Sequence, residues 1–379
     1  MSNSIRIPVF WHPVMLDHRP PDGVFKFPDV EFLARTEPHP ERPERAENIL
    51  GVLEHFFEDS APIESTRPAS RSELSSVHTE THIEWVEEFA EEGGGRFDGT
   101  TTGGNEHTFE AARYASGAAI EAAKKALETS PDAIPYALVR PPGHHAQSDT
   151  ADGFCFFNNT AVAAQTLIET THVESIAIVD WDVHHGNGTQ EIFYDRADVL
   201  PISIHHEHGS WHETYHPQTG ELAEHGEGDG EGYTVNVPVP AAVGNDGYAE
   251  IFESVVEPIL AEYRPDALLV SAGQDSGIAD PNGRNMVDRD GFRWMASAVR
   301  RYATDYADSN LAVIQEGGYQ PSHLAFATLG VFEGLLDTDV DLSEYGIDGD
   351  PFAWLEESRE PLESRLDDVR DHYGEYWSL

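Results

Sequence analysis

Short apolar runs alternate along the chain with longer segments in which apolar residues recur at helical spacing. The runs Ala267-Leu268-Leu269-Val270 and Leu311-Ala312-Val313-Ile314 contain no polar position, which is typical of parallel strands buried on both faces. The pattern predicts strands at residues 5–11, 134–140, 175–181, 198–205, 233–238, 266–272 and 310–315. It predicts helices at residues 41–57, 79–92, 107–128, 158–170, 246–263, 288–307 and 321–335, with Asp246 as an N-cap. Strands that alternate with helices predict an α/β fold, with a mostly parallel central sheet flanked by helices on both faces.

Polar motifs follow several of the predicted strands at the point where each strand ends. They are Arg140-Pro141-Pro142-Gly143, Asp180 to His184, Ala272 to Asp275 and Glu316 to Tyr319. In open α/β sheets the functional sites gather at the carboxyl ends of the strands. We therefore expect these four motifs to meet at one edge of the sheet.

The run from Asp180 to Gln190 reads Asp-Trp-Asp-Val-His-His-Gly-Asn-Gly-Thr-Gln and is the most informative stretch of the sequence. It follows a strand-like segment, and the strand period of two places Asp180, Asp182 and His184 side by side on one face. Two carboxylates and an imidazole at the end of an apolar strand are costly to bury unless a cation compensates them. A divalent metal site is one interpretation, and an exposed acidic turn without metal is the other.

Three further motifs favour a metal-dependent catalytic site over an exposed acidic turn. Asp275, in a glycine-flanked turn, would complete a set of two carboxylates and one imidazole, which suits zinc and leaves positions open for water and substrate. His144 and His145 follow a strand and are candidates for general base and general acid, although a His-His pair alone can be a surface accident. Two glycines before Tyr319 allow a tight turn that directs its hydroxyl inward, where a phenol can donate to an oxyanion.

Composition narrows the classes of protein that fit. The formal net charge is −46, with only three lysines among 23 basic residues, as in proteins adapted to molar salt. So acidic a chain offers no basic patch for nucleic acid. Cys155 is the only cysteine, so no internal disulfide can form, and neither a signal peptide nor a membrane span is evident. We expect a cytoplasmic, soluble protein that binds neither nucleic acid nor membrane.

Together these motifs resemble the histone deacetylase and acetylpolyamine amidohydrolase family, in particular its class II branch. The resemblance covers residues 8–335 and includes His39-Pro40-Glu41-Arg42-Pro43-Glu44-Arg45 near the N-terminus. Five motifs in the same order and with matching spacing are more specific than any one of them. The resemblance implies an arginase/deacetylase-like α/β fold and a zinc-dependent deacetylase with one Zn²⁺ per chain.

The resemblance also implies a role for individual residues. Asp182, His184 and Asp275 match the zinc ligands. The catalytic positions are matched by His144, His145, Asp180, Asn187 and Tyr319. Asp180 would partner the first histidine and Asn187 the second, while Tyr319 would stabilise the oxyanion. A structural potassium site would draw on Asp180, Asp182, His184 and Ser203. The acyl channel would be lined by Phe154, Arg45 and Gly318, with either Tyr215 or His216 opposite Phe154.

The sequence leaves the substrate, the physiological metal (zinc or iron) and the assembly open. The expected reaction removes acetyl or another short acyl group from an amine such as acetyl-lysine or an acetylpolyamine. Two alternatives are a non-catalytic module that binds acylated amines and an arginase-like ureohydrolase with two metal ions. We expect a catalytic domain at residues 1–335 and an acidic extension at 336–379 that packs on it. The extension is also a candidate contact in a homo-oligomer, a dimer or a tetramer.

Overall fold

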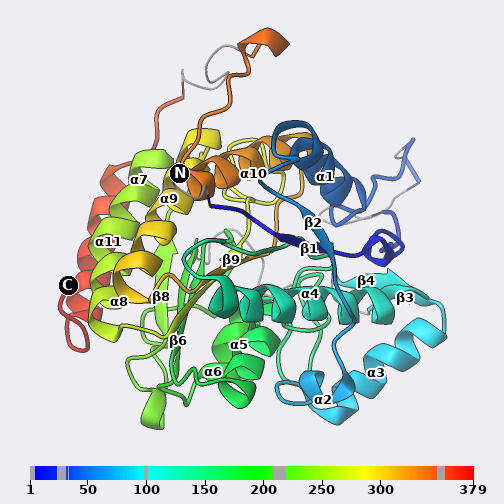
Figure 1. The fold of residues 1–379 in the computed structure, drawn as a ribbon, viewed down its shortest axis with the longest axis horizontal. Helices are drawn as coiled ribbons and strands as arrows, with labels where there is room; N and C mark the ends of the chain where they lie inside the picture. The colour runs from blue at the N-terminus through cyan, green and yellow to red at the C-terminus, as the bar shows by residue number, and fades with distance from the viewer. Residues whose placement is uncertain (1–4, 24–30, 33, 98–100, 208–218, 348–354) are drawn as a thin grey trace.

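The computed structural model describes residues 5–23, 31–32, 34–97, 101–207, 219–347 and 355–379 (Figure 1). Within these residues the centre is an eight-stranded sheet with the strand order β2-β1-β5-β10-β9-β6-β7-β8. The strands span Val9–Trp11 (β1), Ile63–Ser65 (β2), Tyr136–Ala137 (β5), Ile176–Asp180 (β6), Val199–His206 (β7), Val235–Val239 (β8), Ala267–Ala272 (β9) and Leu311–Gln315 (β10). All neighbouring strands of this sheet pair in parallel, so the predicted α/β fold is confirmed.

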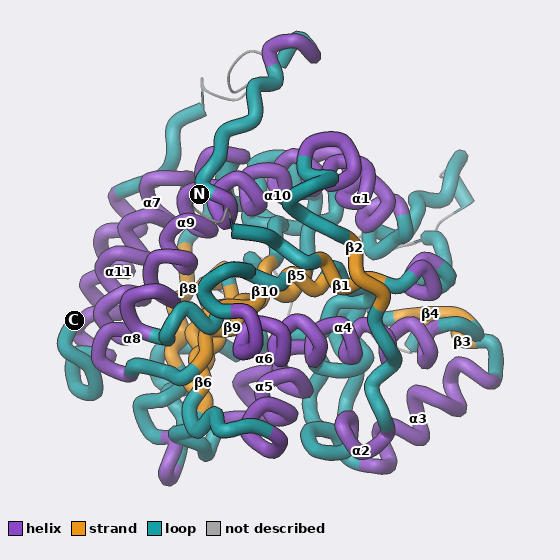
Figure 2. The backbone as a smooth tube through the Cα atoms, in the orientation of Figure 1, coloured by secondary structure: helices purple, strands orange, loops and turns teal. Residues whose placement is uncertain are grey.

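Helices cover both faces of the sheet. They span Glu44–Phe56 (α1), Arg71–Leu74 (α2), Glu80–Glu91 (α3), Thr108–Thr129 (α4), Asn159–Thr170 (α5), Asn187–Phe193 (α6), Asn245–Ile251 (α7), Glu257–Tyr263 (α8), Arg289–Tyr306 (α9), Pro321–Leu336 (α10) and Glu360–Tyr373 (α11). Figure 2 shows α1 and α10 on one side of the row of strands and α4 and α5 on the other. The strands β6, β7, β8, β9 and β10 are buried along their whole length because helices shield both of their faces.

Two expectations about helices need correction. The predicted helix at 246–263 begins at Asn245, and Gly244 occupies the N-cap position without a side-chain cap, so the N-cap expected at Asp246 is wrong. That helix is also interrupted by a π turn at Phe252–Val256 before α8 continues it. In addition, the structure contains an antiparallel hairpin that the pattern did not predict, formed by β3 (Gly94–Arg96) and β4 (Gly103–Asn105).

The C-terminal segment packs beside the edge strand β8 through α11 (Figure 1). The helix buries Leu362, Leu366, Val369 and Tyr373. The backbone N–H of Asn236 in β8 donates to the Tyr373 hydroxyl at 2.7 Å, and the Trp377 indole donates to the carbonyl oxygen of Gly232 at 2.9 Å. No helix within the described residues is both long and apolar enough to cross a membrane.

Candidate active site

Four neighbouring strands deliver the predicted motifs to one edge of the sheet. The strands β5, β10, β9 and β6 are adjacent in the sheet, and each is followed by one of the polar motifs. Asp180 at the end of β6 pairs in register with Ser271 of β9, and Gln315 at the end of β10 pairs with Ala272 of β9. Because the strands are parallel, their carboxyl ends lie side by side, and the motifs that follow them converge.

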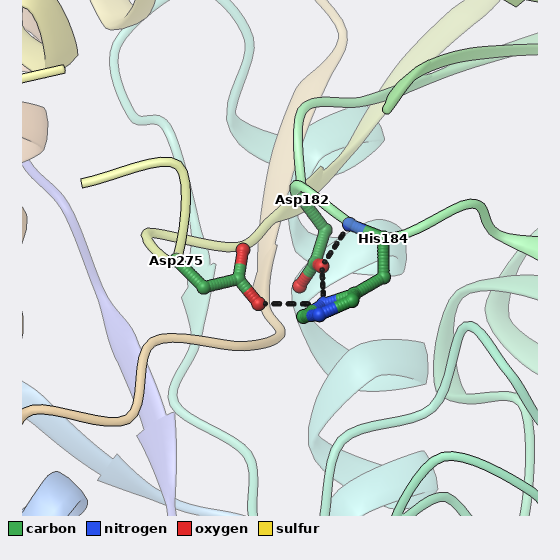
Figure 3. Close-up of side chains that lie close together, drawn as sticks. All are labelled: Asp182, His184 and Asp275. Atoms are coloured by element: carbon green, nitrogen blue, oxygen red, sulfur yellow. Dashed lines mark hydrogen bonds and ion pairs between the residues drawn. The ribbon is translucent and has the colours of Figure 1, made fainter. Parts of the chain in front are cut away.

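Asp182, His184 and Asp275 form a compact cluster at this edge (Figure 3). The His184 Nδ1 atom lies 3.0 Å from Asp182 Oδ1 and 2.9 Å from Asp275 Oδ2. One ligand atom from each residue can be chosen so that all lie within 4.8 Å of one another, close enough to hold a metal ion. The strand period does not explain how this cluster forms, because β6 ends at Asp180. Asp182 and His184 lie in the loop that follows the strand.

Burial and mutual charge govern protonation in this cluster. Burial, together with the charge of Asp182, raises the pKa of Asp275 to about 7. Burial opposes the charged form of His184, but Asp275 and Asp182 outweigh it and raise the pKa of His184 to about 9. Burial likewise opposes ionisation of Asp182, yet the positive His144 and His184 hold its pKa below the usual range. The two carboxylates therefore demand a neighbouring positive charge, which a proton on His184 or a metal ion can supply.

The backbone that follows β10 approaches the cluster closely. The N–H of Gly317 donates to Asp182 Oδ2 at 2.8 Å. A Cβ atom at position 317 would collide with the carboxylates of both Asp182 and Asp275, so only glycine fits there. Gly318 has a φ of 114°, a left-handed conformation that favours glycine. These two positions explain the paired glycines of the Glu-Gly-Gly-Tyr motif.

The tandem histidines have different partners although they are adjacent. His144 Nδ1 lies 2.9 Å from Asp180 Oδ2, and its Nε2 lies 3.7 Å from Asp182 Oδ1. Burial disfavours a charge on His144, but Asp182 and Asp180 together raise its pKa well above the usual value. His145 Nδ1 lies 2.6 Å from Oδ1 of Asn187, a neutral amide. The two rings are 4.1 Å apart between centroids, so one histidine faces carboxylates and its neighbour faces an amide.

Tyr319 is only 5% exposed and lies close enough to the cluster for the charges of Asp182 and Asp275 to act on it. Its ring meets Phe154 edge to face at 5.4 Å between centroids, and the Arg45 guanidinium carbon lies 4.7 Å from the ring centre. Burial raises the pKa of Tyr319 well above its usual value, although the Arg45 charge opposes this. Arg45 Nε also donates to the carbonyl oxygen of Gly318 at 2.5 Å. The predicted residues Phe154, Arg45 and Gly318 are thus grouped around the phenol.

Buried carboxylates without an expected role also lie around the site, among them Asp280 and Glu41. Asp280 is 9% exposed, and its Oδ2 accepts the backbone N–H of Tyr319 at 2.6 Å. Glu41, which is fully buried, lies 2.6 Å from Arg140 Nε and 3.1 Å from Arg45 Nη1. Burial opposes its ionisation, but the charge of Arg140 holds the pKa of Glu41 well below the usual range. A buried charge between arginines could have been suspected from the Arg-rich Glu41 motif, whereas nothing in the sequence linked Asp280 to Tyr319.

The remaining predicted residues have mixed outcomes. Ser203 lies on β7 in register with Asp180, and its hydroxyl is 3.0 Å from His205 Nδ1. The side chains of Asp182 and His184 are engaged in the cluster with Asp275, so the potassium site stays a prediction. Tyr215 and His216, the two candidates for the position opposite Phe154, lie outside the described residues.

Comparisons with known proteins agree on one family. The family model described as the histone deacetylase domain matches residues 39–335. The chain is 36% identical to histone deacetylase 8 of Arabidopsis thaliana over 98% of its own length and 97% of that protein. It is 37% identical to a histone deacetylase-like amidohydrolase of Pseudomonas aeruginosa, with coverage of 78% and 77%. It is 33% identical to a probable deacetylase of Archaeoglobus fulgidus, with coverage of 92% and 96%.

A solved structure supports the same assignment at the level of the fold. The crystal structure of the HDA15 HD domain superposes with a TM-score of 0.83 at 33% sequence identity, and the match covers 99% of this chain and 96% of that one. The arginase/deacetylase-like fold expected from the sequence is therefore confirmed. On this evidence the chain belongs to the histone deacetylase family and is a hydrolase that acts on amide bonds.

Proposed function

We propose that this protein is a zinc-dependent deacetylase that removes acetyl or another short acyl group from an acylated amine, such as acetyl-lysine or an acetylpolyamine. The observation that carries the proposal is the convergence of three groups at the same strand ends. These groups are the cluster of two carboxylates and an imidazole, the tandem histidines, and Tyr319. Each supplies one requirement of amide hydrolysis, namely a metal site, a proton shuttle and an oxyanion donor.

Asp182, His184 and Asp275 would hold one divalent ion. Their oxygen and nitrogen donors suit zinc, and three protein ligands leave positions open for water and substrate. Asp182 and Asp275 are both fully buried, so a cation there would compensate charge that is otherwise expensive to keep. A bound zinc ion supplies Lewis-acid polarisation of the acyl carbonyl and lowers the pKa of a bound water.

His145 is the proposed proton shuttle, and His144 is its electrostatic partner. The Asn187 carbonyl oxygen can only accept, so the contact with it places a proton on His145 Nδ1 and leaves Nε2 as a base. His145 can then take a proton from the attacking water and return it to the leaving amine. His144 Nδ1 lies 2.9 Å from Asp180 Oδ2, a carboxylate that favours the protonated ring and so suits His144 to the role of electrostatic partner.

Tyr319 is the proposed oxyanion donor. Because its pKa is raised, the phenol keeps its proton at neutral pH and can donate to the oxygen of the tetrahedral intermediate. Asp280 holds the backbone of Tyr319, while Phe154 and Arg45 hold its ring. These contacts restrict the phenol to one orientation before substrate arrives, which is what preorganised electrostatic stabilisation requires.

The structure and the comparisons also bear on the number of metal ions and on the two alternative functions. Within the described residues, Asp182, His184 and Asp275 are the only group of three or more carboxylate, imidazole or thiol side chains close enough to hold a metal. An arginase-like site for two metal ions would need a fuller set, so a single ion is favoured. Family membership favours hydrolysis over a non-catalytic binding module. A structural potassium ion beside Asp180 and Ser203 remains part of the proposal.

A substrate panel tests the proposed reaction. The zinc-loaded protein in molar KCl would be given acetyl-lysine peptides, acetylputrescine, acetylspermidine and longer acyl amides, and released carboxylate would be quantified. We expect acetate from at least one acetylated amine and no release from His145→Ala. Arginine, assayed for urea, serves as the ureohydrolase control. Urea production, or no carboxylate release from any acyl amine by zinc-loaded protein, would contradict the proposal.

A further inference from the structure

Glu316 is a buried carboxylate that the proposed chemistry does not use. It is the first residue after β10 and is 0% exposed. Its Oε2 accepts the backbone N–H of Gly143 at 2.7 Å and the backbone N–H of His144 at 3.2 Å. One oxygen therefore binds two consecutive amides of the turn that leads into the tandem histidines.

The backbone of Glu316 is itself firmly held. The Glu316 N–H donates to the carbonyl oxygen of Ala272 in β9 at 3.1 Å, and the Glu316 carbonyl oxygen accepts from Arg45 Nη2 at 2.6 Å. The segment just before the turn at 143–144 is also held by α5, because the side-chain amide of Asn159 donates to the Pro141 carbonyl oxygen at 3.2 Å. Hydrogen bonds from the end of β10 and from the start of α5 therefore both fix the backbone of residues 141–144.

A carboxylate is an expensive choice for this position. Burial raises the pKa of Glu316 to about 7, although the nearby His144 charge and the hydrogen bond from the Gly143 N–H oppose this. Asp180 and Asp182 already place two carboxylates next to His144. An apolar side chain would fill the space at a lower desolvation cost. What an apolar side chain cannot do is accept from two buried amides, which would otherwise lack partners.

We propose that Glu316 is a positioning residue, whose reach across to the Gly143–His144 amides sets the backbone from which both histidines project. Its role differs from those of Asp180 and Asn187, which bind the imidazole rings rather than the backbone. The inference rests on the proposed function, because it gives Glu316 a role only if the histidines act on substrate.

Two substitutions test the length of the Glu316 side chain separately from its charge. Glu316→Gln keeps the length of the side chain and a carbonyl oxygen that can accept from both amides, but it removes the charge. Glu316→Asp keeps the charge but is one methylene shorter, so its carboxylate falls short of the turn. If position matters, Glu316→Asp loses roughly 10- to 100-fold in kcat with little change in KM, because small misplacements of catalytic groups have effects of that size. Glu316→Gln then retains most of the wild-type kcat.

Hydrogen exchange supplies a readout that is independent of activity. Exchange of the amides at residues 143 and 144, followed in a peptide spanning that turn, should be faster in Glu316→Asp than in the wild type and nearly unchanged in Glu316→Gln. The matched control is Glu333, also 0% exposed, whose carboxylate binds Arg289 on α9 away from the site. The same pair of substitutions at Glu333 should change thermal stability but neither kcat nor exchange at 143–144.

The results for the two Glu316 variants decide whether the position or the charge of this carboxylate matters. If Glu316→Asp keeps wild-type kcat and amide protection, or if Glu316→Gln is the more impaired of the two, charge rather than position is what matters and the inference is overturned. His145→Ala, measured beside them, distinguishes a failure of the proposed function from a failure of the role given to Glu316. An active His145→Ala sinks the proposed function, whereas an inactive His145→Ala next to a fully active Glu316→Asp sinks only the role of Glu316.

Discussion

At the scale of single residues, the site gives chemically similar groups different tasks through their neighbours. His144 faces Asp180 and Asp182, whereas His145 faces the Asn187 amide. The residue identities at these positions were predicted from the sequence, because the motifs carry them in a fixed order. The supporting contacts were not, because the bond from Tyr319 to Asp280 joins residues 39 positions apart and depends on how loops fold over the sheet.

Tyr319→Phe tests the oxyanion role at this scale. The substitution removes only the hydroxyl and leaves the packing against Phe154 and Arg45 in place. We expect kcat to fall about 10²- to 10³-fold, with KM and zinc content nearly unchanged, because the hydroxyl acts mainly in the transition state. Steady-state kinetics on an acetylated amine, with elemental analysis as the control, measures this. A near-normal kcat at full zinc occupancy would show that Tyr319 is structural.

At the scale of elements, the sequence predicted best where apolar residues form unbroken runs. The strands β9 and β10 fall within the predicted ranges because both of their faces are buried. The edge strand β2 was missed since Ile63 and Ser65 are exposed and give no burial pattern. The hairpin β3–β4 was missed because four of its six residues are glycines, which carry no side-chain signal. By contrast, α11 does show apolar residues at 362, 366, 369 and 373, a helical spacing that the acidic composition obscured.

The buried side chain of His78 connects several elements and makes the stability of the fold depend on pH. His78 precedes α3, lies within 2.9 Å of the Gln147 carbonyl oxygen, and accepts the N–H of Asn158 at the N-cap of α5. The bond that Nε2 accepts from Asn158 requires the neutral ring, and burial, with a smaller effect of His82, lowers the pKa of His78 to about 3. The unfolded chain therefore takes up a proton below about pH 6.5 that the folded protein does not, so stability falls as the pH falls from there towards 3.

Urea unfolding of the wild type and of His78→Gln at pH 7 and pH 5, in the same salt, measures this effect. Glutamine can accept from Asn158 and donate to Gln147 but does not titrate. Between the two pH values the wild type should lose about 2 kcal/mol more unfolding free energy than the variant, from about 1.5 pH units below the unfolded pKa at about 1.4 kcal/mol per unit. Equal losses in the two proteins would mean that His78 titrates normally in the folded state.

At the scale of the whole molecule, charge is the dominant feature. The formal net charge of −46 implies strong self-repulsion at low ionic strength. At about 1 M salt the Debye length is only about 3 Å, so the repulsion between exposed carboxylates is largely screened. Many arginines lie in exposed or half-buried ion pairs, such as Arg71 with Glu80 and Glu87, and because each exposed pair stabilises the fold only slightly, its screening by salt costs little.

Thermal melts across a KCl series test this balance. We predict that the melting temperature rises steeply between dilute buffer and molar KCl, because screening relieves more repulsion than it costs in ion-pair attraction. A series with sucrose in place of KCl controls for general exclusion effects. A melting temperature that stays constant or falls as KCl increases would be incompatible with a salt-adapted surface.

The central claim is that one divalent ion, held by Asp182, His184 and Asp275, drives hydrolysis of an acylated amine. Zinc titration into metal-depleted protein, with bound metal and acetate release followed in the same samples, tests it most directly. The account predicts that activity rises in proportion to bound zinc and reaches its plateau at one ion per chain, and that Asp275→Ala neither binds this ion tightly nor releases acetate. Full activity in metal-depleted protein, or a plateau reached only at two ions per chain, would contradict the account.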